Sequence, residues 1–208
     1  MKHLPNALTL SRIAVTPLCL WGLASGTFAG QLAGTVLFIL AAISDYWDGR
    51  LARSMNVRSR LGQFLDPLAD KVLVLGAFAV MLFFPPLATS LAAPAGAWLP
   101  LLAVGFIAAR DLGVTQLRSY HERNDRPLRT LPAAKWKTGM QLTFLILLQL
   151  LLVVSHGRSL GGTLGAIGRG AAGVIESAFP LAFLVITAGV TVYTGLLYLR
   201  GERAEPIP

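Results

Sequence analysis

Four of the chain's six aspartates lie between residues 45 and 70, at spacings that could support metal chemistry. Asp45 and Asp48 are three residues apart, and Asp66 and Asp70 are four residues apart. In a helix, both spacings place the two carboxylates of a pair on one face. Because only a short segment separates the pairs, we expect their helices to form an antiparallel hairpin in which the pairs face each other.

Carboxylates that converge in this way need positive charge nearby, since four of them cannot all stay ionised unaided. Carboxylate oxygens are hard ligands, and no His or Cys occurs among residues 45–70, which favours Mg²⁺ or Mn²⁺ over zinc. Two such ions would balance the charge and leave room for a diphosphate. Gly49 and Gly62 would allow close approach of a ligand, and Arg53 could reach a phosphate oxygen. The alternative is that these are interfacial charges ending two helices, with Arg53 and Arg58 as salt-bridge partners.

The composition places this cluster in a membrane. Hydrophobic residues make up 54% of the chain and charged residues only 13%, against about 25% charged in a typical soluble domain. This excludes a disordered chain, a coiled coil and an ordinary soluble globule. The single cysteine, Cys19, provides neither a disulfide framework nor a cysteine metal site. The net charge of +8 lies between apolar stretches, which favours anionic lipid or a phosphorylated substrate over nucleic acid as partner.

Continuous apolar runs rich in Ala and Leu predict an all-α, polytopic membrane protein with a single domain over residues 1–208. The N-terminus shows no convincing cleavable signal, so we interpret it as a retained first helix. Glycines and prolines predict loops near residues 26–30, 85–86 and 157–173, while Pro17 and Pro180 fall inside spans and predict kinks. A transmembrane helix needs about 20 apolar residues, which predicts six spans: 6–27, 31–53, 62–84, 96–118, 135–155 and 172–199.

The basic residues predict how these spans are oriented. They concentrate in loops 54–61 and 119–134 and at both chain ends, whereas residues 22–30 and 85–95 carry no charge. Positively charged loops stay on the cytoplasmic side of a membrane. We therefore expect both termini and the aspartate cluster at the cytoplasmic face of the inner (cytoplasmic) membrane.

The aspartate segment resembles the signature of the CDP-alcohol phosphotransferases, also called CDP-alcohol phosphatidyltransferases. Residues 45–70 match D-x2-D-G-x2-A-R-x8-G-x3-D-x3-D at every fixed position, and the expected six spans agree with that family's fold. The resemblance implies that an alcohol attacks the lipid-bearing phosphate of a CDP-lipid and that CMP leaves. It implies that Asp45, Asp48, Asp66 and Asp70 hold two divalent ions and that Asp70 is also the catalytic base. It further implies a CDP-lipid site at Asp45, Gly49, Ala52, Arg53, Ser59 and Gly62.

Two further segments resemble phosphatidylglycerophosphate synthases within that family. Residues 5–12 match P-N-x-L-T-x-x-R, which adds Asn6 and Thr9 to the nucleotide site, although simple helix capping is an alternative for both. Residues 134–141 resemble the element G-K-x-K-T-x-x-Q, with Ala134 where glycine is usual. Arg110 lies inside an expected span beside Asp111, which as a sequence neighbour is not expected to share its face. These features predict CDP-diacylglycerol and glycerol 3-phosphate as substrates, with an acceptor site formed by Arg110, Arg118, Lys135 and Lys137.

Other acceptors remain open at this point. Phosphatidylglycerophosphate synthases usually carry Arg-Glu where this chain has Arg110-Asp111, and Arg-Asp also resembles cardiolipin synthases, whose acceptor is phosphatidylglycerol. An inositol phosphate is a further alternative. Lys135 and Lys137 could instead be ordinary cytoplasmic-side charges.

Proteins of other classes fit less well. Intramembrane prenyltransferases separate their two aspartate motifs over a longer chain. A cation-coupled transporter would need charged groups near mid-membrane. A homodimer is compatible with the family, and small residues such as Gly76, Ala77 and Ala79 would permit close helix contact.

Overall fold

The computed structural model describes residues 4–55, 60–83, 98–123 and 132–199, and all elements in these ranges are helical. Side-chain environments are described within 13–44, 71–83, 98–117, 119–121 and 136–198. The all-α prediction is confirmed for this part of the chain. The elements are α1 (Leu4–Ala24), α2 (Phe28–Met55), α3 (Arg60–Phe83), α5 (Trp98–Arg123), α6 (Pro132–Ser155), the 3₁₀ turn η1 (His156–Ser159), α7 (Gly162–Glu176) and α8 (Phe179–Leu199).

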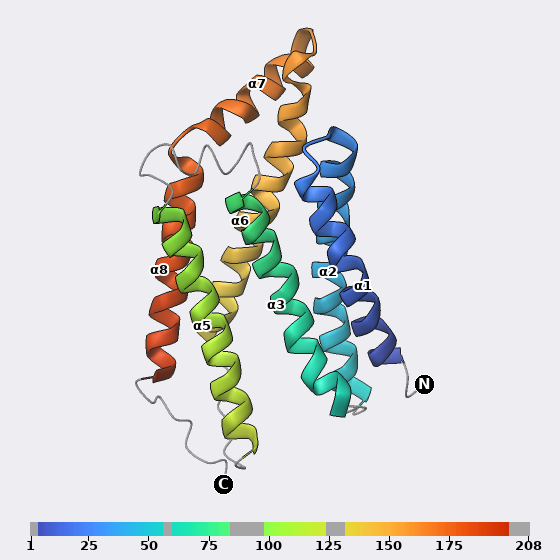
Figure 1. Cartoon of the computed structure of the whole chain (residues 1–208), viewed down its shortest axis with the longest axis vertical. Helices are drawn as coiled ribbons and strands as arrows, with labels where there is room; N and C mark the ends of the chain where they lie inside the picture. The colour runs from blue at the N-terminus through green and yellow to red at the C-terminus, as the bar shows by residue number, and fades with distance from the viewer. Residues whose placement is uncertain (1–3, 56–59, 84–97, 124–131, 200–208) are drawn as a thin grey trace.

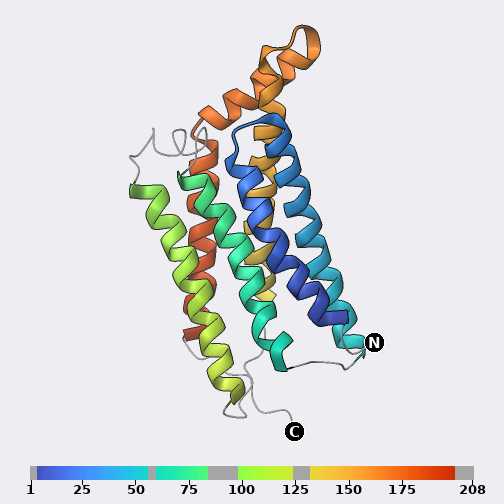
Figure 2. The ribbon, with the colours of Figure 1, turned by 45° about the vertical axis from the view of Figure 1, so that its right-hand side comes forward.

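The long helices stand side by side in a bundle, and the shorter α7 runs obliquely across one end of it (Figure 1). Successive long helices run in opposite directions, so that the start of α1, the end of α2, the start of α3 and the end of α8 all lie at the other end (Figures 1 and 2). The aspartate-bearing segments of α2 and α3 are therefore at the same end of the bundle.

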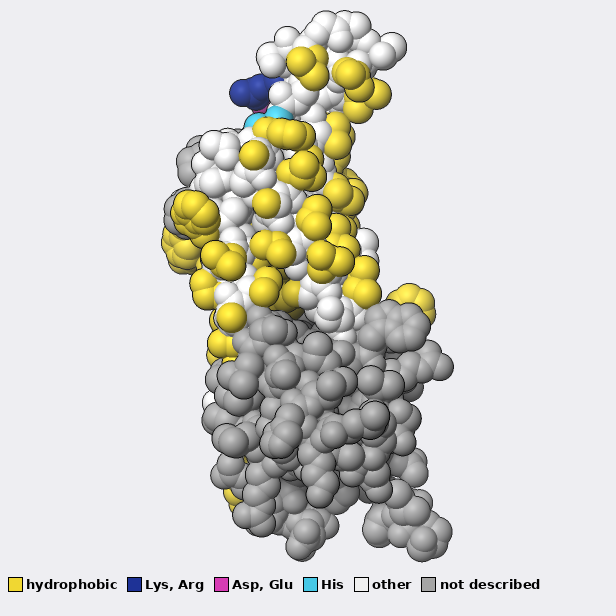
Figure 3. Space-filling model, turned by 90° about the vertical axis from the view of Figure 1, so that its right-hand side faces the viewer, with side chains coloured by type: hydrophobic (Ala, Val, Ile, Leu, Met, Phe, Trp, Pro, Cys, Tyr) yellow, Lys and Arg dark blue, Asp and Glu magenta, His cyan; other side chains and the backbone are white. Residues whose placement is uncertain are grey.

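Three stretches within the described residues are long and apolar enough to cross a membrane, namely Trp98–His121, Trp136–Ser159 and Phe179–Tyr198. Shorter apolar helical stretches occupy Ile13–Ala24, Phe28–Ser44 and Lys71–Phe83. Exposed hydrophobic side chains are also spread over the described part of the face shown in Figure 3. The chain is thus an integral membrane protein, while six complete crossings remain a prediction.

The buried core receives side chains from all the long helices. Its largest members are fully enclosed, and the rings of Phe78 in α3 and Phe144 in α6 stack with their centroids 5.9 Å apart. Packing of this density makes the relative positions of the helices sensitive to the volume of single side chains. Other members include Cys19, Phe38, Ile107, Leu148 and Leu184.

Helices α1 and α2 pack closely through glycine. A Cβ atom added at Gly34 would lie 2.6 Å from the backbone nitrogen of Leu23 and 2.9 Å from the carbonyl oxygen of Cys19. The Cys19 thiol donates a hydrogen bond to the Gly34 carbonyl, with an Sγ–O distance of 3.3 Å. Gly26 lies between these helices with φ of 66°, a backbone conformation that glycine adopts at no steric cost. The break predicted near residues 26–30 is therefore confirmed at residues 25–27, whereas Gly30 lies in the first turn of α2.

The prediction for residues 157–199 was wrong in two respects. The expected loop at 157–173 is largely helix α7, and the expected span at 172–199 is divided, because α7 ends at Glu176 and α8 begins at Phe179. Gly165 and Gly168 are buried against the backbone of residues 157–160, where a Cβ would collide. Their small size thus serves helix packing and does not mark a loop.

Two further expectations also change. Pro180 is the second residue of α8, within the first turn, where a missing N–H costs no helical hydrogen bond, so it starts the helix instead of kinking it. Gly76 packs against α1 of the same chain, since a Cβ atom there would lie 2.6 Å from the Leu20 side chain. Gly76 is thus used for packing α3 against α1 and offers no argument for a homodimer.

Candidate active site

The four signature aspartates lie on two helices, α2 and α3. Asp45 and Asp48 belong to the C-terminal half of α2, and Asp66 and Asp70 belong to the N-terminal half of α3. These halves lie toward the same end of the bundle (Figures 1 and 2). Both pairs thus have the helical spacing that the sequence predicts. Their side chains lie outside the described residues, so their shared metal site remains a prediction.

The other predicted nucleotide contacts are distributed over the same end. Asn6 and Thr9 lie in the first turns of α1, while Gly49, Ala52 and Arg53 lie in the last turns of α2 and Gly62 near the start of α3. Ser59 and the side chains of this set lie outside the described residues. Among the side chains that the structure does describe, no group of three or more His, Cys, Asp or Glu residues could hold a metal ion.

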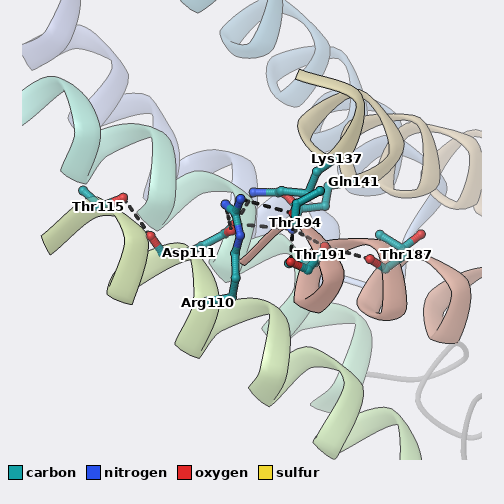
Figure 4. A network of polar contacts seen from close by, with 8 residues as sticks. All are labelled: Arg110, Asp111, Thr115, Lys137, Gln141, Thr187, Thr191 and Thr194. Carbon is teal, nitrogen blue, oxygen red and sulfur yellow. Dashed lines mark hydrogen bonds and ion pairs between the residues drawn. The ribbon is translucent and has the colours of Figure 1, made fainter. Parts of the chain in front are cut away.

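Asp111 is the centre of a buried polar network between α5 and α6 (Figure 4). Its Oδ1 atom lies 2.6 Å from Lys137 Nζ and 3.2 Å from Arg110 Nη1, and its Oδ2 atom accepts a hydrogen bond from Gln141 Nε2 at 3.3 Å. The side chains of Asp111 and Lys137 are only 1% and 2% exposed. A carboxylate buried within membrane helices needs such partners, because an uncompensated charge there is costly.

Helix α8 completes the network with threonine hydroxyls. Arg110 Nη2 donates to Thr194 Oγ1 at 3.2 Å, and Gln141 Nε2 lies 3.5 Å from Thr191 Oγ1 (Figure 4). Each hydroxyl donates its own proton to a backbone carbonyl within α8, which leaves its oxygen free to accept. The network therefore ties α5, α6 and α8 together.

The contact between Arg110 and Asp111 corrects one sequence-based expectation. Neighbouring residues on a helix point in directions about 100° apart, which follows from 3.6 residues per turn, and on this basis the two side chains were not expected to meet. The long arginine side chain nevertheless folds back to reach the carboxylate at 3.2 Å. The Arg110 guanidinium also lies 5.7 Å from the centroid of the Tyr198 ring in α8.

The predicted acceptor-binding residues fall into two groups. Arg110 and Lys137 are brought together on Asp111, as described above. Arg118 and Lys135 belong to α5 and α6, on the side of the network toward the signature end of the bundle, and their side chains lie outside the described residues. The structure thus brings together two of the four residues.

Lys71 follows Asp70 directly near the middle of α3. Its positive charge acts on both Asp111 and Lys137, so this part of α3 lies within electrostatic range of the buried network.

The roles of Asp111, Gln141, Thr191 and Thr194 were not predicted from the sequence. Thr187, Thr191 and Thr194 follow the i, i+4, i+7 spacing of one helix face and are fully buried or nearly so. In a helix as apolar as α8, such a polar stripe is a signal of interhelical hydrogen bonding. Thr191 and Thr194 confirm this signal, whereas the Thr187 hydroxyl bonds only within α8.

Comparison with known proteins agrees with this arrangement. The model of the CDP-alcohol phosphatidyltransferase family matches residues 2–195. The chain therefore belongs to that family. The resemblance that residues 45–70 indicated is thus confirmed.

Individual relatives carry more specific names. The chain is 32% identical over 201 residues to the CDP-diacylglycerol–glycerol-3-phosphate 3-phosphatidyltransferase 1 of Arabidopsis thaliana, covering 95% of this chain and 62% of the relative. It is 31% identical to a CMP-forming cardiolipin synthase of Oryza sativa subsp. japonica, covering 95% of this chain and 56% of the relative. It is 30% identical to the CDP-diacylglycerol–glycerol-3-phosphate 3-phosphatidyltransferase of Cereibacter sphaeroides, covering 95% and 94%. The chain thus spans about three fifths of the length of the two plant relatives.

Proposed function

We propose that this protein transfers the phosphatidyl group of CDP-diacylglycerol to glycerol 3-phosphate, producing phosphatidylglycerophosphate and CMP in phospholipid biosynthesis. The proposal rests on one observation, namely that the family signature and a buried network of charged side chains occur in the same helical bundle. The family signature runs from α2 into α3, and the buried Arg110–Asp111–Lys137 network lies within electrostatic range of Lys71, the residue that follows Asp70. The names of relatives that cover 95% of the chain support the same reaction.

The donor set fits hard divalent cations. Asp45, Asp48, Asp66 and Asp70 offer only carboxylate oxygens, which suit Mg²⁺ or Mn²⁺. Two such ions, when bound, supply positive charge that stabilises the attacking and leaving oxygens of a displacement at phosphorus. The role of the chain is to hold these four carboxylates on α2 and α3, toward the same end of the bundle.

Asp70 is the proposed general base. The acceptor hydroxyl loses its proton to the Asp70 carboxylate while its oxygen forms a bond to the phosphorus that carries the lipid. The bond from that phosphorus to the CMP oxygen breaks, and CMP leaves with the electron pair. Asn6, Thr9, Asp45, Gly49, Ala52, Arg53, Ser59 and Gly62 hold the CDP group in this scheme.

The acceptor is held through its phosphate. Arg110 and Lys137 provide two cationic groups beside each other, and Arg118 and Lys135 add two more on the same helices. Guanidinium and ammonium groups are the usual protein ligands of phosphate oxygens.

The proposed topology has six spans, with both termini and the active site at the cytoplasmic face of the inner membrane. It is supported by basic residues in the helix ends nearest the signature, such as Arg53 in α2, Arg60 in α3 and Arg123 in α5. This location would give a soluble phosphorylated acceptor direct access from the cytoplasm.

Phosphatidylglycerol is the second candidate acceptor, because one relative is named a cardiolipin synthase. An acceptor panel distinguishes the two. Purified protein would receive CDP-diacylglycerol and Mg²⁺ with glycerol 3-phosphate, phosphatidylglycerol, inositol phosphate or serine, and CMP release would be measured. We expect CMP with glycerol 3-phosphate. CMP release with another alcohol but not with glycerol 3-phosphate would overturn the assignment of the acceptor. No CMP release with any alcohol would overturn the enzymatic function and favour a transporter.

A further inference from the structure

Asp111 is held in one orientation by groups on both sides of its carboxylate. Lys137 and Arg110 share Oδ1, whereas Gln141 occupies Oδ2, and the hydroxyl of Thr115 donates to the Asp111 backbone carbonyl at 2.7 Å. With a 1% exposed side chain, the carboxylate has little freedom to choose another rotamer. It therefore defines a fixed point to which both cations are attached.

Asp111 neutralises only part of the charge of Lys137 and Arg110. The two cations together carry one more unit of charge than the carboxylate. The Nε atom of Arg110 is buried with no hydrogen-bond partner among the described residues. A buried donor of this kind is costly unless an acceptor reaches it. An anion that reaches this place finds both positive charge and hydrogen-bond donors.

We propose that Asp111 is a positioning residue for the acceptor, an inference that rests on the proposed function. By sharing one oxygen between Lys137 and Arg110, its carboxylate sets the ammonium and the guanidinium side by side as a clamp for a phosphomonoester. Asp111 itself does not touch the acceptor, since its negative charge repels a phosphate. Its effect passes through the two cations.

Helix α8 fixes the other side of this clamp. Thr194 receives a hydrogen bond from Arg110 Nη2, so the guanidinium is held between a carboxylate on its own helix and a hydroxyl on α8. Thr187 offers a matched comparison, because its hydroxyl donates only to the Phe183 carbonyl of its own helix. A valine at either position keeps the shape of threonine and removes the hydroxyl.

A positioning role and a merely charge-balancing role predict opposite results. Asn at position 111 keeps the size of the side chain but removes its negative charge. If Asp111 only balanced charge, the additional positive charge would draw the phosphate more strongly and the KM for the acceptor would fall. If Asp111 positions the cations, their loss of alignment raises that KM.

The test compares the full-length variants D111N, D111E, T194V and T187V in detergent–lipid micelles with CDP-diacylglycerol and Mg²⁺. For D111N we expect the KM for glycerol 3-phosphate to rise by about tenfold or more, as the loss of hydrogen bonds to a charged group implies. The KM for CDP-diacylglycerol should stay within about twofold of the wild-type value, because the nucleotide site lies on other helices. D111E should recover most of the affinity, T194V should raise the acceptor KM several-fold, and T187V should behave as wild type.

Three results would overturn the inference. They are an unchanged or lower acceptor KM in D111N, a parallel rise of both KM values, and a D111N effect that D111E does not reverse. If D111N does not fold, T194V decides: an acceptor KM equal to that of T187V would overturn the clamp. A wild-type protein inactive with every acceptor would refute the proposed function itself, whereas an active wild type with an unaffected D111N refutes only the role of Asp111.

Discussion

Gly195 of α8 lies directly against the side chain of Arg110. A Cβ atom at position 195 would meet Arg110 Cγ at 2.7 Å, which is closer than real Cβ atoms approach other atoms. The absence of a side chain at this position thus gives the arginine room to lie along α8 and reach Thr194, the preceding residue of that helix. The position of the guanidinium depends on a glycine that carries no chemistry of its own.

A methyl group at this position should therefore disturb the acceptor site. We expect Gly195→Ala to displace Arg110 and raise the KM for glycerol 3-phosphate several-fold, with a smaller effect on the KM for CDP-diacylglycerol. The matched control is Gly189→Ala, since a Cβ at Gly189 on the same helix has no atom within 4 Å. Steady-state kinetics of CMP release gives both KM values for each of the two variants. Equal kinetics for the two variants would contradict this role of Gly195.

The close contact of α1 and α2 gives a prediction about stability. Gly34→Ala would place a methyl group against the backbone of Leu23 and Cys19, which cannot yield as a side-chain end can. Overpacking of this kind costs about 1–3 kcal/mol, so the variant should unfold at a lower temperature in detergent. Gly105→Ala on α5, where a Cβ meets nothing within 4 Å, should be neutral or slightly stabilising. A Gly34→Ala variant as stable as Gly105→Ala would show that the helices do not pack as described.

The proposed base gives a prediction about catalysis. Asp70→Asn keeps the size of the side chain and removes its ability to take a proton, so turnover should fall by about 10²–10⁴-fold. Binding of CDP-diacylglycerol, measured separately at equilibrium, should be largely preserved. Glu176→Gln serves as the control, because Glu176 ends α7 at the opposite end of the bundle. Substantial activity remaining in Asp70→Asn would remove the assignment of the base.

Much of the helical framework follows from apolar runs ended by charged residues, glycine and proline. The predicted spans 31–53 and 62–84 differ by only a few residues from α2 (Phe28–Met55) and α3 (Arg60–Phe83). Residues 157–173 were predicted wrongly because glycine has two uses. It breaks helices through its backbone freedom, but at Gly165 and Gly168 it permits close packing within one. Composition alone does not distinguish these uses.

Some residues of the site could be predicted from the sequence and others could not. The signature aspartates and Lys137 follow from motifs that are local in the sequence. Asp111 was interpreted only as the neighbour of Arg110, although it is the group on which Arg110, Lys137 and Gln141 meet. Those contacts join residues 26 and 30 positions apart on different helices. Such pairings depend on helix rotation, which hydrophobicity constrains poorly when a span is apolar nearly all round.

The proposed mechanism requires that α2 and α3 together hold divalent cations between Asp45, Asp48, Asp66 and Asp70. Electron paramagnetic resonance of the purified protein titrated with Mn²⁺ detects such a site. We expect two ions per chain with magnetic coupling, since ions that share carboxylates in a two-metal site lie about 3.5–4 Å apart. Asp66→Asn should abolish the coupled signal, and removal of metal by a chelator should abolish CMP release. Isolated, uncoupled Mn²⁺ alone, or a coupled signal unchanged in Asp66→Asn, would contradict the account.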